Sequence, residues 1–121
     1  TNVRSSAPGV SATLLWCTDR MPADNAIGRD IEDMGARLIG TAPPVNGTRF
    51  AMVELAPGVR TGMHRTETVD YVIVLSGELE LELDSGCVSL KPGDAVVQRG
   101  TDHIWANRGD MPVRAAVITV D

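Results

Sequence analysis

The sequence predicts an all-β protein made of one antiparallel barrel or sandwich, and three observations support this class. The chain has 121 residues, which suffices for one hydrophobic core but not for two. From Gly47 onward, short runs of β-forming residues alternate with turn residues. One run, Glu78–Leu83, alternates glutamate and leucine strictly, as a strand with one buried face does. We therefore expect a single domain.

Residues 1–46 differ from the rest of the chain and predict an N-terminal arm. Prolines interrupt any regular pattern here, at Pro8, Pro22, Pro43 and Pro44. Only Ala12–Thr18 and Ala36–Ile39 resemble strands, and a helix over Asp24–Met34 is a weak alternative. Because an exposed strand edge invites pairing, we expect the arm to supply one or two edge strands, which a dimer could exchange.

Residues 47–121 predict the barrel itself. Each expected strand is bounded by glycine, proline, aspartate or serine, the residues that favour turns. The expected strands are Thr48–Leu55, Asp70–Leu75, Glu78–Leu83, Cys87–Leu90, Ala95–Gln98, His103–Asn107 and Val113–Val120. Short strands in this number and at this spacing indicate an antiparallel sandwich or barrel.

The side-chain pattern of each strand predicts which of its faces is covered. In Glu78–Leu83 the leucines are expected to face the core and the glutamates to face solvent. By contrast, Tyr71–Leu75 and Ala95–Val97 are apolar on both faces, so their outer face needs a cover. A second sheet or a partner subunit would provide it, and we expect a homodimer.

Composition narrows the class of function. The formal net charge is −5, and the arginines are scattered rather than clustered, among them Arg29, Arg37, Arg49, Arg60, Arg65, Arg99, Arg108 and Arg114. Because phosphate binding needs clustered positive charge, neither nucleic acid nor an anionic membrane is an expected partner. The chain shows no apolar run that could span a bilayer and no signal peptide, so we expect a cytoplasmic protein. Cys17 and Cys87 are expected to be unpaired, mostly buried thiols.

The only two histidines lie in motifs bounded by glycine. His64 lies in Gly58-x5-His64-x-Thr66-x3-Asp70-x6-Gly77, and His103 lies in Gly93-x9-His103-x3-Asn107. Neutral imidazole is the commonest protein ligand for a transition metal, and a barrel strand can direct it into an enclosed pocket. The two motifs therefore predict where a functional site lies, but not which reaction takes place there.

In order and separation, these motifs resemble the two motifs of the cupin superfamily. The resemblance covers residues 47–121 and implies an antiparallel double-stranded β-helix, also called a jelly-roll barrel. The chain departs from the family pattern at Thr66, which stands in place of a second histidine, and at Asp70, which stands in place of glutamate. Gln98 stands near the position of the family's proline.

The resemblance implies one divalent transition metal, held by His64, Asp70 and His103. If all three side chains face the interior, two imidazoles and one carboxylate surround one point, which suits iron, zinc, nickel or manganese and leaves coordination positions open. Threonine cannot replace imidazole and aspartate is shorter than glutamate, so we expect a lower metal affinity than in a four-ligand cupin. The pocket is expected to include Thr66, Gln98, Trp105, Met52 and Glu54.

Three functions stay open at this point. The first is a metal-dependent enzyme acting on a small organic acid or related metabolite, with oxygenase, decarboxylase, isomerase and lyase or dehydratase chemistry all implied by the resemblance. The second is a non-enzymatic module that binds a small ligand, which the missing ligand at Thr66 favours. The third is an assembly unit with a vestigial pocket, against which the presence of both histidines and Asp70 argues.

Overall fold

A computed structural model describes residues 2–28 and 30–121, and the side chains of residues 2–6 and all of Arg29 lie outside the description. Within the described residues the chain forms nine strands and no helix. The strands are β1 (Asn2–Ala7), β2 (Val10–Thr18), β3 (Thr48–Leu55), β4 (Val69–Ser76), β5 (Leu79–Leu83), β6 (Gly86–Leu90), β7 (Ala95–Arg99), β8 (Ile104–Ala106) and β9 (Val113–Val120). The expectation of an all-β, antiparallel fold is confirmed.

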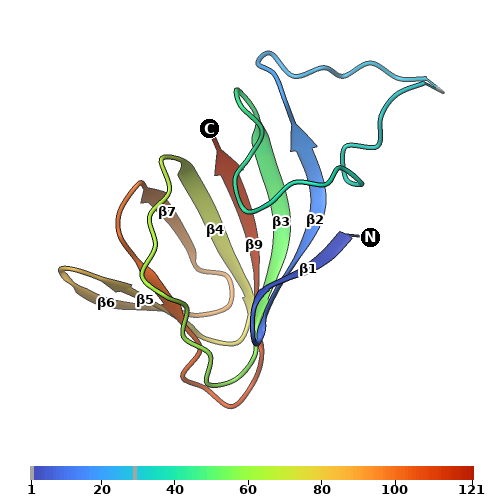
Figure 1. Cartoon of the computed structure of the whole chain (residues 1–121). Helices are drawn as coiled ribbons and strands as arrows, with labels where there is room; N and C mark the ends of the chain where they lie inside the picture. Colours follow the sequence, from blue (N-terminus) through green and yellow to red (C-terminus); the bar gives the residue numbers. More distant parts are fainter. Residues whose placement is uncertain (1, 29) are drawn as a thin grey trace.

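The strands form two antiparallel sheets (Figure 1). The large sheet has the order β1-β2-β3-β9-β4-β7, and the small sheet has the order β6-β5-β8. The loop between β3 and β4 extends the small sheet, because Arg60 bridges to Ala106 and His64 bridges to His103. In Figure 1 this loop runs past the small sheet and β7 before it leads into β4.

The N-terminal arm contributes two strands to the large sheet. β1 and β2 form a hairpin, and β2 pairs with β3 of the same chain. The prediction of a strand at Ala36–Ile39 is wrong, because this stretch is irregular and Leu38 is exposed. A strand needs a neighbouring strand for its backbone groups, and this stretch pairs with none of the described strands. No helix forms in the described part of Asp24–Met34.

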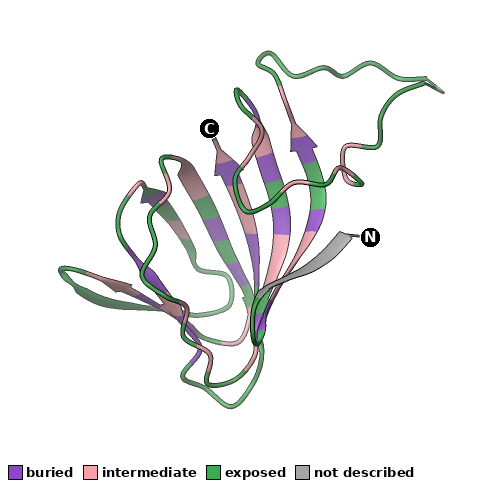
Figure 2. Cartoon of the chain, in the orientation of Figure 1, coloured by how far each residue is buried: buried purple, intermediate pink, exposed green. Residues whose placement is uncertain are grey.

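The hydrophobic core lies between the inner faces of the two sheets. Val74 and Val113 are fully buried, and most of the side chains that alternate with the exposed ones along β3, β4 and β9 are buried (Figure 2). The leucines of β5 face this core and its glutamates face outward, which agrees with the strict alternation of the sequence. Glu80 and Glu82 form ion pairs with Arg108 and Arg60 on that outer face.

Two further expectations concern the cysteines and the membrane. Both cysteines are unpaired, and Cys17 is buried while Cys87 is exposed. The Cys17 thiol donates a hydrogen bond to the Met34 carbonyl, which ties the segment after β2 to the sheet. No described segment forms a helix of the length and apolar character needed to cross a membrane.

Candidate functional site

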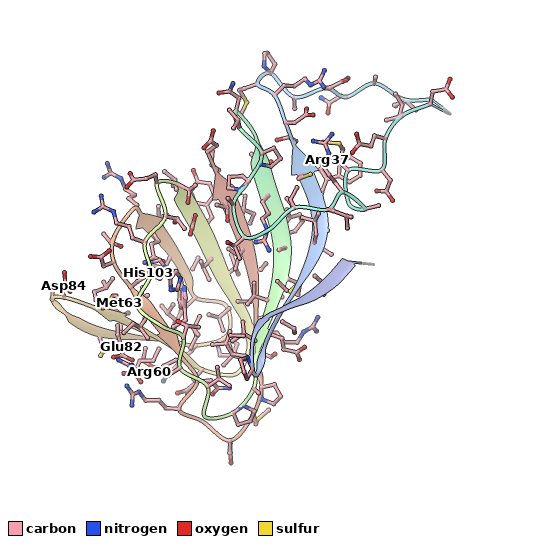
Figure 3. All side chains as sticks on the ribbon, viewed as in Figure 1. Arg37, Arg60, Met63, Glu82, Asp84 and His103 are labelled. Carbon is pink, nitrogen blue, oxygen red and sulfur yellow. The ribbon has the colours of Figure 1, made fainter. Side chains whose placement is uncertain are left out.

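The two histidines lie side by side, although 38 positions separate them in the chain. Their backbones form an isolated antiparallel bridge, in which each N–H donates to the carbonyl of the other at 3.0 Å. The imidazole centroids are 4.0 Å apart, with the ring planes at 64°. His103 lies behind the loop that carries Met63 in Figure 3. We call His64 and His103 the histidine pair.

The same local hydrogen bond orients both imidazole rings. Nδ1 of His64 is 2.9 Å from the Gly62 carbonyl, and Nδ1 of His103 is 2.7 Å from the Thr101 carbonyl. Because a carbonyl only accepts, Nδ1 carries the proton in each neutral ring. Nε2 is then the unprotonated nitrogen, which is the form that binds a metal or accepts a proton.

The two histidines of the pair differ in burial. His103 is 1% exposed, whereas His64 is exposed. Burial lowers the pKa of His103 below its ordinary value, an effect that the hydrogen bond to the Thr101 carbonyl partly offsets. His103 is therefore neutral at physiological pH, as a metal ligand or general base must be.

Near the histidine pair, a row of polar side chains crosses the inner face of the large sheet. Directly opposite one another on β3, β9, β4 and β7 lie Arg49, Thr119, Asp70 and Gln98. Arg49, Thr119 and Gln98 are buried, and Asp70 is half-buried. We call these four residues the polar row. The charge of Asp70 acts on the histidine pair, because it raises the pKa of His103 and so offsets a small part of the lowering by burial.

Asp70 is engaged by threonine hydroxyls. Thr68 Oγ1 lies 2.8 Å from Asp70 Oδ1 and 2.9 Å from Thr66 Oγ1. Thr66, at the position of the family's second histidine, thus belongs to a hydroxyl chain that leads to the carboxylate. These hydroxyl contacts connect Asp70 to the segment between β3 and β4, which also carries His64.

The structure brings the two histidines together but does not gather Asp70 with them into a metal cage. Among the residues of 2–28 and 30–121, no cluster of three or more His, Cys, Asp or Glu side chains is placed to hold a metal ion. The histidine pair has the chemistry of two metal ligands, with Nδ1 anchored and Nε2 available. The residues therefore fit a two-imidazole site.

The expected pocket residues divide into two groups. The Trp105 ring packs edge-on against His103, at 5.7 Å between centroids, and borders the hydrophobic core. Gln98 is 4% exposed, and its Nε2 donates to Thr101 Oγ1 at 3.3 Å. Met52 and Glu54, however, alternate with the buried residues of β3 and lie on its outer face, away from the histidine pair.

Asn107, the last residue of the second motif, is a structural residue. Its Nδ2 donates to the Leu55 and Met111 carbonyls at 3.1 and 2.8 Å, and its Oδ1 accepts from the Gly109 N–H at 3.0 Å. The side chain is 1% exposed. It joins the end of β3 to the turn between β8 and β9, so it closes the barrel rather than serving the histidine pair.

Sequence reasoning missed Arg49 as a site residue. It appeared only as one of several scattered arginines, but it is 8% exposed and faces the barrel interior. The alternation of β3 carries the signal, because Arg49 shares a face with Ala51 and Leu55, both buried. The sequence does not show which face of β3 is the inner one, since Phe50 and Met52 on the other face are also apolar.

Comparison with known proteins agrees with this architecture. The family model described as "Cupin domain" matches residues 51–119, and the chain belongs to the cupin family. Among solved structures, KdgF from a Halomonas species superposes with a TM-score of 0.67 at 16% identity, covering 100% of this chain and 87% of that one. The expected family and barrel fold are confirmed.

Two curated relatives are similar to this chain over most of its length. The phomopsin biosynthesis cluster protein C′ of Diaporthe leptostromiformis is 41% identical over 99 residues, covering 78% of this chain and 52% of the relative. A cupin-domain-containing oxidoreductase of Hypocrea virens is 40% identical over 117 residues, covering 91% of this chain and 58% of the relative. The chain thus spans little more than half the length of these two relatives.

Proposed function

We propose that this chain is the cupin domain of an enzyme that acts on a small organic acid or a related metabolite. The histidine pair carries this proposal: two imidazoles in contact, each with Nδ1 anchored to a carbonyl and Nε2 left available. A neutral, buried imidazole with a fixed tautomer is the group that metal binding and proton transfer both require.

His64 and His103 would hold one divalent transition metal, of iron, zinc, nickel or manganese, through Nε2. Bound there, the metal would supply Lewis-acid polarisation of a carboxylate or carbonyl, or a place for dioxygen. The chain's own residues prepare the site. The Gly62 and Thr101 carbonyls orient the rings, and Trp105 separates His103 from the core.

An oxidation is the reaction class that we favour among those open to the fold. The relative from Hypocrea virens, which this chain matches over 91% of its own length, is described as an oxidoreductase. Decarboxylase, isomerase and lyase activities should also be assayed, because the same metal ligands can support these reactions.

Elemental analysis of untagged protein tests the proposal. We expect a transition metal in the parent chain after anaerobic reconstitution, and its loss in His64→Ala and His103→Ala variants that remain folded. Thr66→His, which restores the family's second histidine, is expected to increase metal retention during dialysis. A parent chain that retains no metal would contradict the metal-dependent enzyme.

A non-enzymatic module for a small ligand is the second candidate. The observation that favours it is the absence of a three-ligand cluster among the described residues. In that case a small molecule binds tightly with no metal requirement and is recovered unchanged. Isothermal titration of chelator-treated protein, followed by chromatography of the recovered ligand, separates this outcome from catalysis.

We also propose that the barrel forms a homodimer through the outer face of the large sheet. A continuous apolar row crosses five strands there, consisting of Trp16, Phe50, Ile118, Tyr71 and Val97. Tyr71 is 44% and Val97 59% exposed, which is unusual for so extended an apolar strip. A two-fold axis would place one strip against its copy and cover both.

Sedimentation of two variants tests this dimer. Val97→Glu places a charge in the strip and is expected to shift the protein to a monomer at micromolar concentration. Val88→Glu is the matched control, because Val88 is exposed on β6 of the small sheet. A parent chain that sediments as a monomer would remove the proposal.

A further inference from the structure

Two buried side-chain polar atoms in the described part of the chain lack a hydrogen-bond partner, namely Arg49 Nε and Gln98 Oε1. Both residues belong to the polar row, on strands β3 and β7. A buried polar atom without a partner destabilises the folded state unless a bound molecule supplies the partner. The two atoms are of opposite character, since one donates and the other accepts.

Arg49 needs an anion. Its guanidinium stays protonated at neutral pH despite burial, which lowers its pKa, and it forms no ion pair with any described residue. Asp70 is close enough for its charge to raise the pKa of Arg49 in part, but the Asp70 carboxylate is hydrogen-bonded to Thr68. A planar carboxylate that accepts from the guanidinium fork is the anion that such a group binds best.

Gln98 needs a donor. Its Nε2 is already used by Thr101 Oγ1, so Oε1 faces the interior as an unused acceptor. A hydroxyl group on a ligand would donate to this oxygen. Arg49 on β3 and Gln98 on β7 lie on the same inner face of the large sheet, with Thr119 of β9 and Asp70 of β4 directly between them (Figure 1).

We propose that the polar row is a ligand subsite for a hydroxy-substituted carboxylic acid, with the carboxylate held by Arg49 and the hydroxyl donated to Gln98 Oε1. This inference deepens the proposed function by naming the class of organic acid, and it rests on that function for the expectation that a small acid enters the barrel. It requires neither bound metal nor turnover, so it can be tested on binding alone.

Isothermal titration of the full, chelator-treated chain provides the test. The probes are malate with its deoxy analogue succinate, and 4-hydroxybenzoate with benzoate and the uncharged 4-hydroxybenzamide. We expect at least one hydroxy acid to bind at millimolar concentration or below. Its deoxy analogue should bind several-fold more weakly, and the amide should not bind.

Three variants assign the contacts. Arg49→Met should weaken binding of the hydroxy acid by about tenfold or more, the factor that a charge-assisted hydrogen bond contributes. Gln98→Leu should retain binding of the carboxylate but lose the preference for the hydroxyl. Arg114→Met is the matched control and should bind as the parent does, because Arg114 is exposed on the outer face of β9.

Nuclear magnetic resonance gives a second measurement, which does not depend on whether the Arg49→Met variant folds. The Nε–H of Arg49 should shift on addition of the hydroxy acid in the parent chain. The subsite is overturned if no probe binds, if the amide binds as well as the acid, or if Arg49→Met folds and binds as the parent does. None of these results alters the metal content that tests the proposed function, so the two failures are distinguishable.

Discussion

The inner face of the large sheet has two regions with opposite roles. Towards one end, three successive rows of side chains are apolar, ending in the pair Leu55 and Val113. One row beyond Ala51 and its partners, on the same strands, lies the polar row with its unsatisfied Arg49 and Gln98 atoms. Most side chains of the apolar rows are buried in the hydrophobic core, whereas the polar row leaves two buried polar atoms without a hydrogen bond. The apolar rows stabilise the barrel, and the polar row is available for a ligand.

The largest expected effect comes from removing a side chain from the apolar rows. Leu55→Ala deletes buried methyl groups and leaves a cavity, so we expect the free energy of unfolding to fall by about 3 kcal/mol. Urea denaturation measures this change. Leu38→Ala is the control, because Leu38 is exposed, and it should stay within about 0.5 kcal/mol of the parent. An equal loss in both variants would contradict the assignment of the core.

Asn107→Ala should produce the next largest loss, at the closed end of the barrel. The substitution leaves the Leu55 and Met111 carbonyls without this donor, and each unsatisfied buried group costs about 1–3 kcal/mol. We expect a total loss of about 2 kcal/mol by urea denaturation. Asn25→Ala, at an exposed position, should change nothing. Loss of the parent's metal content without loss of stability would instead make Asn107 a site residue.

Arg49→Met should not lower the free energy of unfolding, in contrast to Leu55→Ala and Asn107→Ala. A buried guanidinium without an ion-pair partner is replaced by an apolar side chain of similar length, so we expect the free energy of unfolding to stay unchanged or rise by about 1 kcal/mol. The same urea titration measures it. A decrease greater than about 2 kcal/mol would show that Arg49 stabilises the fold rather than serving a ligand.

The smallest expected effect is a pH dependence from His103. Because burial lowers the pKa of His103 in the folded state, the unfolded chain binds the proton more readily. This contribution is fully present above the ordinary value of 6.5 and is lost as the pH falls from there towards the lowered pKa. In metal-free protein, the stability of the parent should therefore fall more steeply below neutral pH than that of His103→Gln. Parallel pH profiles would contradict the burial effect, since the carboxylates contribute equally to both chains.

The sequence by itself determined the strands from Thr48 to Val120 and the orientation of β5. Their turn residues and their two-residue periodicity are local signals that need no knowledge of neighbouring strands. The two glycine-bounded motifs also predicted that His64 and His103 share a site, and the structure brings the two rings into contact. Local pattern sufficed here because strand alternation directs side chains independently of the rest of the chain.

Only the tertiary structure decided which residues surround the histidine pair. The inner face of β3 is the one that carries Arg49, and Met52 and Glu54 lie on the other face, because β9 and β2 set the register on both sides of β3. The irregular course of Ala36–Ile39 also depends on strand pairing, since this stretch pairs with none of the described strands. Asp70 is held by Thr68 apart from the histidines, a contact between side chains that strand periodicity does not specify. Register, edge pairing and side-chain partners are long-range properties, and they depend on the whole barrel.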